Sequence, residues 1–240
     1  MHRFFAERTG TDEARLTEEE SRHALKVLRL RSGDPVELIL PDGLYEGALT
    51  QQGDRAGARV LRALPSPEAV TRVTLFQGLP KGDKMDLVVQ KGTEAGVAAF
   101  TAVEMSRSVA RLSGGDRDKK AARWQRIAME AAKQCGRSAV PPVTIIGFKD
   151  LKSALSACGL VLVPWEEERA VTLREALRAR PDARDIGLVI GPEGGIDPAE
   201  IDSLKALGAV PVTLGRRIFR TETAGLAAAI MTLYERGEYD

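Results

Sequence analysis

The stretch Leu188-Val189-Ile190-Gly191-Pro192-Glu193-Gly194-Gly195 joins a short apolar run to a glycine-rich turn. A second run, Val210-Pro211-Val212-Thr213-Leu214, ends in another turn that extends from Gly215 to Arg220. Each turn leads into a segment with helical character, so the pattern predicts two successive strand–turn–helix units. Ligands of α/β sheets bind where strand carboxyl ends meet helix amino ends, because free N–H groups and bare backbone converge there. We therefore expect the functional site at these two turns.

A glycine turn after a strand can also serve only to reverse the chain. The spacing is neither Gly-x-Gly-x-x-Gly nor that of a P-loop, which excludes the usual dinucleotide and nucleoside-triphosphate fingerprints. The second turn, however, carries Arg216, Arg217 and Arg220 just before an almost wholly apolar helix expected over 225–234. Such a helix must be buried. Two turns with this clustered charge favour a functional over a purely structural role.

Composition describes an ordinary globular protein of 240 residues, with 43% hydrophobic and 29% charged residues. The net charge of +1 argues against a general polyanion binder, and the 5% aromatic content argues against an extensive base-stacking platform. The basic residues are nevertheless clustered, over 22–31, 107–126 and 216–220. Local clusters of this kind are typical of a phosphate-contacting surface.

Cysteine and histidine are too scarce for redox or metal chemistry. Cys135 and Cys158 have no metal-ligand spacing, and the two histidines, His2 and His23, are far apart in the sequence. We therefore expect no metal. The chain shows no signal segment and no long apolar run, so we expect a cytoplasmic protein that does not enter a membrane.

The first 67 residues form a predicted β-rich unit. Thr17 and Glu20 have capping-box spacing at the start of a helix. Short strands with tight turns suggest a small barrel; we expect strands over 2–5, 36–40, 44–50 and 58–64. A basic helix is expected over 22–31, with Arg22, Lys26 and Arg29. The residues alone leave open whether it is a solvated face or an RNA contact.

Pro65-Ser66-Pro67 is the best linker in the sequence, because two prolines in three residues continue neither a helix nor a ladder. We therefore divide the chain into domains 1–67 and 68–240. In the second domain apolar strands alternate with helices, which predicts an α/β fold with a mostly parallel sheet covered on both faces. The expected strands lie over 73–77, 100–104, 143–146, 160–163, 186–190 and 210–214, and the expected helices over 84–95, 118–135, 151–157 and 172–178.

The first turn, followed by Leu-Gly-x-Arg-Ile-x-Arg-Thr-Glu-Thr-Ala over 214–224, resembles the S-adenosylmethionine-binding end of SPOUT methyltransferases. More narrowly, it is similar to the family that methylates N3 of a uridine in small-subunit (16S) ribosomal RNA. The resemblance covers nearly the whole chain, through motifs at 81–85, 90–97, 107–109 and 130–137. One departure is Arg216, where the family usually has proline.

The resemblance implies a deep trefoil knot in a SPOUT domain, a PUA-like RNA-binding barrel before it, and a homodimer built around the apolar C-terminal helix. It also implies S-adenosylmethionine as cofactor and small-subunit ribosomal RNA as partner, without a metal. Three strand-end loops would hold the cofactor, with Glu193 orienting the backbone. The expected cofactor-binding residues are Pro164, Trp165, Gly191, Pro192, Glu193, Gly194, Gly195, Leu214, Gly215, Arg217, Ile218, Thr223 and Ala224.

Methylation at N3 of a uridine requires that the N3 proton leaves, so two kinds of catalytic group are expected. Glu94 and Glu222 are candidate proton acceptors. Arg220, Arg107 and Arg137 are candidates for stabilising the resulting anion, although Arg107 and Arg137 could instead only bind phosphates. We predict Arg220 and Glu94 as the catalytic residues, although Glu94 has Lys91 as an alternative ion-pair partner on its own helix. The predicted RNA-binding residues are Arg22, Lys26, Arg29, Arg107 and Arg137.

Two other functions compete with this interpretation. A non-catalytic RNA-binding protein of the same shape needs no donor pocket, and the paired glycine turns argue against it. A nucleotide-binding enzyme that acts on a small molecule needs no separate basic unit, and the residues of 22–31 argue against that.

Overall fold

The computed structural model describes residues 1–239 and separates into two compact units. The barrel unit comprises Met1–Glu68 together with Ala132–Ala139, and the sheet unit comprises Ala69–Ala131 and the chain from Val140 onward. The sequence did not indicate that residues 132–139 belong with the first unit. That the first unit is an RNA-binding domain stays a prediction.

Five strands of the barrel unit form a closed barrel in the order β1-β2-β5-β4-β3. Parallel pairing of β1 with β3 closes it, whereas the other pairs are antiparallel. Alternation of side chains along the strands places Phe4, Val36 and Leu38 inside. The strands are β1 His2–Arg8, β2 Glu13–Leu16, β3 Pro35–Leu40, β4 Gly43–Gln52 and β5 Arg55–Ala63. The short strand β2 was missed in the sequence.

The basic segment after β2 is not the continuous helix that the sequence predicts over 22–31. Helix α1, Glu18–Arg22, begins after Thr17, whose Oγ1 accepts the Glu20 N–H at 3.2 Å, and a π-helical segment follows over His23–Val27. The Leu30 N–H then bonds to the Ala24 carbonyl, which ends the helix, and Arg29 takes a left-handed φ of 58°. Leu28 and Leu30 pack against the barrel core, so Arg29 lies outside the helix on an exposed turn.

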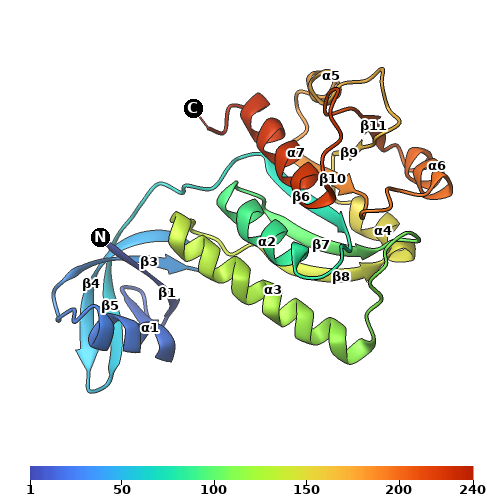
Figure 1. The fold of residues 1–240 in the computed structure, drawn as a ribbon. Coiled ribbons are helices and arrows are strands. Elements are labelled where there is room, and N and C mark those ends of the chain that lie inside the picture. The colour runs from blue at the N-terminus through green and yellow to red at the C-terminus, as the bar shows by residue number, and fades with distance from the viewer. Residues whose placement is uncertain (240) are drawn as a thin grey trace. The chain divides into compact units, whose positions relative to one another are not determined.

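The sheet unit contains a six-stranded sheet, with all strands parallel, in the order β11-β9-β10-β6-β7-β8. Helices cover both faces (Figure 1). The strands are β6 Arg72–Gly78, β7 Ala99–Glu104, β8 Val143–Gly147, β9 Leu160–Pro164, β10 Asp185–Ile190 and β11 Val210–Val212. The helices are α2 Lys84–Glu94, α3 Gly114–Cys135, α4 Phe148–Leu155, α5 Leu173–Arg178, α6 Pro198–Ala206 and α7 Thr221–Glu235. This confirms the predicted fold class, an α/β chain with an N-terminal barrel and a parallel SPOUT-type sheet.

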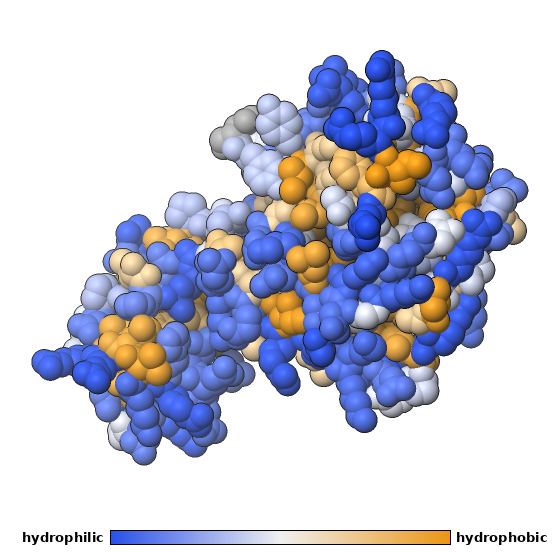
Figure 2. Space-filling view, in the orientation of Figure 1, coloured by the Kyte–Doolittle hydropathy of each residue, from blue (hydrophilic) through white to orange (hydrophobic). Residues whose placement is uncertain are grey.

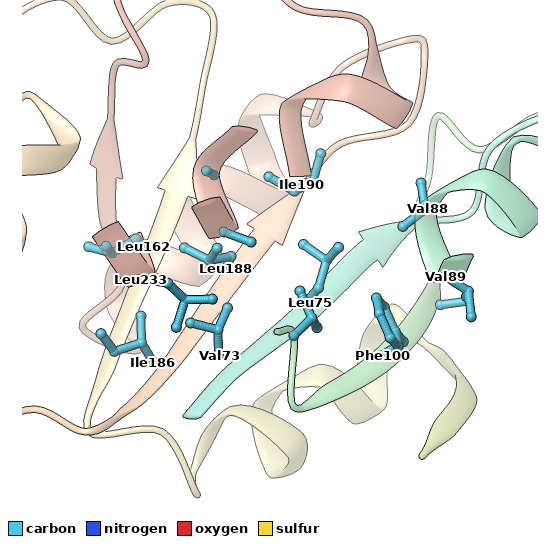
Figure 3. Close-up of a cluster of buried hydrophobic side chains, with 14 of the residues drawn as sticks. Val73, Leu75, Val88, Val89, Phe100, Leu162, Ile186, Leu188, Ile190 and Leu233 are labelled. Carbon is cyan, nitrogen blue, oxygen red and sulfur yellow. The ribbon is translucent and has the colours of Figure 1, made fainter. Parts of the chain in front are cut away.

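Each face of the sheet has its own apolar core. On one face, residues such as Leu75 and Leu188 pack with Val88 of α2 and Leu233 of α7 (Figure 3). On the other, a second cluster joins the strands to α4 and α6. These positions read as unbroken apolar runs in the sequence because parallel strands are buried on both faces.

The order of the strands reverses between β6 and β10. On one side of the sheet β6 is followed by β7 and β8, whereas on the other side β10 is followed by β9 and then by β11. In open α/β sheets such a switch point is where a crevice forms at the carboxyl ends of the strands. The first glycine turn follows β10 at this point, and Thr221 at the start of α7 contacts it. The deep trefoil knot stays an implication of the resemblance.

Helix α7 begins at Thr221, four residues before the predicted start at 225. Arg220 is its N-cap residue, and the N–H groups of Thr223 and Ala224 bond to the Arg220 carbonyl. The glycine at 225 misled the prediction, because Gly is unfavourable inside a helix. It is needed there because a Cβ at Gly225 would lie 3.1 Å from Leu75 and Gln77 atoms on β6.

Candidate active site

The first turn, Gly191 to Gly195, presents backbone rather than side chains. A Cβ at Gly191 would lie 2.8 Å from Cγ1 of Ile196 and 3.0 Å from the carbonyl carbon of Gly195. Gly195 has a φ of +73°, and a Cβ there would lie 2.3 Å from Oε1 of Glu166. The positive φ favours glycine at this position, and a side chain there would also displace the Glu166 carboxylate.

Buried hydrogen bonds fix the first turn to the rest of the sheet unit. The Thr221 hydroxyl donates to the Gly191 carbonyl at 2.6 Å and accepts from Nε2 of Gln77 at 2.8 Å. Gln77 is fully buried at the end of β6. At the other end of the turn, Nη1 of Arg107 donates to the Gly194 carbonyl at 3.2 Å. The turn is therefore held by hydrogen bonds to other segments of the sheet unit.

Glu193 ties the same turn to the loop after β6. Its Oε1 accepts the Lys81 N–H at 3.1 Å and an Nζ hydrogen of Lys84 at 2.8 Å. Partial burial raises the pKa of the Glu193 carboxyl, but the hydrogen bonds from Lys84 and from backbone N–H groups outweigh it, and the pKa lies below its ordinary value. Lys84 also lies 3.2 Å from Oε2 of Glu222 on α7. These contacts support the backbone-orienting role expected for Glu193.

The second turn, Leu214 to Arg220, is held far less firmly. Within residues 1–239 its only side-chain hydrogen bonds are local, between Thr213 and Gly215. Gly215 has a φ of +112° and open space where a Cβ would be, and Ile218 is 76% exposed. Within residues 1–239, no ion pair is formed by Arg216, Arg217 or Arg220. The turn thus exposes backbone, one apolar side chain and uncompensated positive charge.

A cavity of about 510 Å³ lies between the two turns and the loop after β9. All predicted cofactor-binding residues line it except Gly194 and Thr223, and so does the predicted catalytic Arg220. Gly194 instead packs against Arg107, and Thr223 lies exposed in the first turn of α7. Glu166, which belongs to one of the three predicted loops, lines the cavity as well, and six further lining residues were not predicted: Lys84, Arg169, Ile190, Thr213, Phe219 and Thr221. Most of them adjoin predicted residues in sequence, whereas Lys84 comes from a distant motif and could not be placed without the fold.

Several predicted residues lie outside this cavity. Glu94 receives two hydrogen bonds from Lys91 at 2.9 and 3.0 Å, which is the alternative partner considered for it. Arg107 bonds to Gly194 and pairs with Asp197 at 3.3 Å. The roles assigned to Glu94 and Arg107 therefore stay predictions.

The remaining predicted RNA-binding residues belong to the barrel unit. Arg22 and Lys26 line a cavity of about 760 Å³ together with Arg15 and Arg55, and they are exposed to solvent. Arg137, in contrast, is only 8% exposed. Its Nη2 donates to Oε2 of Glu68 at 2.6 Å, so its guanidinium is engaged within the unit.

Residues 1–239 contain no group of three or more His, Cys, Asp or Glu side chains that could hold a metal ion. No helix in this range has the length and apolar character to cross a membrane.

Comparison with known proteins places these features in a family. Residues 66–233 match the model of the RNA methyltransferase domain family. A Mycobacterium bovis protein named ribosomal RNA small subunit methyltransferase E is 38% identical over 221 residues, which cover 88% of this chain and 82% of that protein. The chain is a member of this methyltransferase family.

Solved structures of similar proteins agree with the fold. The Neisseria gonorrhoeae ribosomal RNA small subunit methyltransferase E, bound to S-adenosyl methionine, has a TM-score of 0.79 and 33% identity and covers 98% of this chain and 97% of its own. A putative methyltransferase from Legionella pneumophila, in complex with bound S-adenosyl methionine, has a TM-score of 0.81 and 26% identity and covers 97% of this chain and 96% of its own. The resemblance seen in the motifs at 188–224 is thereby confirmed for the chain as a whole.

Proposed function

We propose that this protein binds S-adenosylmethionine between its two glycine turns and transfers the methyl group to N3 of a uridine in small-subunit ribosomal RNA. The observation that carries the proposal is the cavity of about 510 Å³ at the strand switch point, lined by the backbone of both turns and by arginines that form no ion pair within residues 1–239. The family membership and the donor bound to related structures support the same conclusion.

The cavity fits the donor chemically. Its volume lies within the range of roughly 300–1,000 Å³ that is typical of small-molecule sites. An adenine ring needs an apolar slot, which Ile190, Leu214 and Ile218 would supply. The donor's polar groups need backbone partners, and the glycines of both turns leave that backbone uncovered.

S-adenosylmethionine supplies a methyl group on a sulfonium sulfur, which a nucleophile takes by in-line displacement. The first turn, fixed by Thr221 and Glu193, would keep one wall of the site rigid, so that reacting groups are held in a productive geometry. Arg220 lines the cavity as the N-cap residue of α7 and has no acidic partner within residues 1–239. Its guanidinium is thus available to stabilise the negative charge that develops on the uracil ring.

The acceptor of the N3 proton is the least constrained role. Glu94 pairs with Lys91 and lines no part of the cavity. Glu222, the second carboxylate considered, does not line the cavity either, but it contacts Lys84, which does, and it lies between Thr221 and Ala224 in the sequence, both of which line the cavity. We therefore favour Glu222 as proton acceptor, with Glu94 as the alternative.

The RNA would bind in part through the barrel unit. Arg22, Lys26 and Arg29 are exposed there, and Arg29 is held on a turn of left-handed conformation. Neutralised phosphates release counterions, so this contribution depends on salt.

We further propose a homodimer that uses α7. Its outer side exposes Ile230, Met231 and Tyr234, of which Tyr234 is 65% exposed. Figure 2 shows hydrophobic surface in the region of α7. Apolar side chains gathered on a helix next to a ligand cavity are typical of a protein interface.

Mass mapping of ribosomal RNA tests the proposal. We expect one uridine of the small-subunit RNA to lose an N3-methyl group when the gene is deleted. The wild-type protein should restore it, and the Arg220→Ala variant should not. An unchanged methylation map in the deletion strain would contradict the proposed function.

A further inference from the structure

Lys84 joins three segments of the sheet unit: the start of α2, the first turn and the start of α7. It is the first residue of α2, after the loop that leaves β6, and its Nζ lies 2.8 Å from Oε1 of Glu193 and 3.2 Å from Oε2 of Glu222. Glu193 belongs to the first turn, whereas Glu222 follows the second turn on α7. Lys84 itself lines the cavity, with 31% of its side chain exposed.

The ammonium group of Lys84 has N–H groups that are free to bind a ligand. A lysine ammonium carries three N–H groups, and within residues 1–239 only the one to Glu193 forms a hydrogen bond. The contact with Glu222 is an ion pair, and Oε2 of Glu222 is buried without a hydrogen bond. The hydrogen bond to Glu193 is the main cause that raises the pKa of Lys84, so its charge persists throughout the neutral range.

The chemistry of the proposed substrate calls for two cationic donors. N3 of uracil lies between two carbonyl groups, at C2 and C4. When N3 loses its proton, the negative charge spreads onto both oxygens. A single guanidinium at one side leaves the other oxygen without a cationic partner, and a charged acceptor gains most from a hydrogen bond with a charged donor.

We propose that Lys84 and Arg220 form a cation pair that receives the two carbonyl oxygens of the target uracil, one each. This inference rests on the proposed function. In the step, the N3–H bond breaks and its proton goes to the Glu222 carboxylate. The N3 electron pair forms the new bond to the methyl carbon, and the electrons of the broken carbon–sulfur bond stay on sulfur. Cytosine is rejected, because it has an amino group in place of one carbonyl and offers no acceptor to the second cation.

The alternative is that Lys84 only ties Glu193 to its place. The two roles differ in a double-mutant cycle of Lys84→Met and Glu193→Gln, since Glu193 is the one hydrogen-bond partner of Lys84 among the described residues. The substrate is small ribosomal subunits from a strain that lacks the enzyme, and the readout is the single-turnover rate of methyl transfer. Calorimetry measures the affinity for S-adenosylmethionine in parallel.

A catalytic Lys84 predicts that Lys84→Met lowers the single-turnover rate by about 100-fold, the scale for losing one such stabiliser. Glu193→Gln should cost much less, and Lys84→Met should still lower the rate strongly in the Glu193→Gln background. Lys84→Arg, which keeps the charge, should recover part of the rate. Donor affinity should change far less than the rate in every variant.

If Lys84→Met and Glu193→Gln lower the single-turnover rate equally, and the double variant is no slower, the proposal is overturned. Lys84 would then act only by holding Glu193 in position. A fall in donor affinity that matches the fall in rate would also overturn it. If the wild-type enzyme itself yields no N3-methyluridine, the proposed function fails first. If the wild type and Lys84→Met methylate equally well, only the role of Lys84 fails.

Discussion

Each of the two glycine turns of the sheet unit follows a strand and precedes a helix, but the two turns differ in the hydrogen bonds that hold them in place. The first is fixed by hydrogen bonds from Thr221, Arg107 and Lys84 to its backbone or to Glu193. The second has only local side-chain bonds within residues 1–239 and keeps its arginines unpaired. The difference indicates a division of labour. The first turn is a preformed wall, and the second supplies adaptable backbone and charge to the ligands.

Gly195→Val should have the largest effect on donor binding, because it changes the first turn, which is the preformed wall of the cavity. A β-branched residue at a φ of +73° is strained, and its Cβ would meet Glu166 at 2.3 Å. We expect no detectable binding of S-adenosylmethionine in calorimetry at concentrations that saturate the wild type.

Gly208→Val is the matched control for that experiment. Gly208 has a φ of +84° after α6, but nothing lies within 4 Å of the position of its Cβ. This control carries the same backbone strain away from the cavity. If both variants bind the donor normally, the first turn is not part of its site.

Arg220→Ala should have the next largest effect, now on the second turn. The rate of methyl transfer should fall by at least ~100-fold, since the guanidinium acts on charge that grows during the reaction. Binding of donor and RNA should each change much less. Arg220→Lys should recover only part of the rate, because an ammonium lacks the planar fork.

Arg216→Ala serves as the control within the same turn, since Arg216 is exposed and does not line the cavity. A loss of RNA affinity in Arg220→Ala that equals its loss of rate would mean that Arg220 is a phosphate anchor.

Thr221→Val tests what holds the first turn. The hydroxyl bonds both Gln77 and the Gly191 carbonyl, so its removal leaves a buried donor and a carbonyl acceptor unpaired. We expect a loss of about 1–3 kcal/mol in the free energy of unfolding, measured with denaturant on the full chain. Donor binding should weaken as well.

Thr232→Val removes an equally buried threonine hydroxyl of α7, but one that has no hydrogen-bond partner in the structure. That control should be neutral or stabilising, because it removes a buried hydroxyl that has no hydrogen-bond partner within residues 1–239. If the two variants lose the same stability, the Gln77–Thr221–Gly191 network does not contribute to the rigidity of the turn.

The smallest effect on the cavity is expected from the barrel unit. Replacement of Arg22, Lys26 and Arg29 by Ala should weaken RNA binding and reduce its salt dependence by roughly 0.7–0.9 in slope for each phosphate contact that is lost. The affinity for S-adenosylmethionine should stay unchanged. An unaltered salt slope would show that these cations are only a solvated surface.

Much of this architecture could be predicted from local patterns. Apolar runs such as Leu188 to Ile190 identify buried parallel strands, and the glycines that follow them mark the turns. The start of α7 was misplaced because Gly225 is unfavourable in a helix by propensity. Glycine is required at position 225 because the helix packs closely against β6, and no local sequence pattern reveals that tertiary contact.

The candidate site shows the same limit. Residues of the turns were found because they adjoin one another in sequence. Lys84 was missed because the loop after β6 and the second turn are more than a hundred residues apart, and only the sheet order brings them together. Arg137 differs from Lys84, because it was predicted from its sequence motif as an RNA contact. In the fold its side chain is buried and bonds to Glu68, which the motif could not reveal.

The central claim is that the space between the two turns is a donor site with one wall already in place. Calorimetric titration of the wild-type chain with S-adenosylmethionine and with its demethylated product tests it most directly. We expect both to bind once per protomer and to raise the unfolding temperature, as any ligand of the native state does. Absence of heat and of thermal stabilisation from either compound, far above micromolar concentrations, would contradict the account.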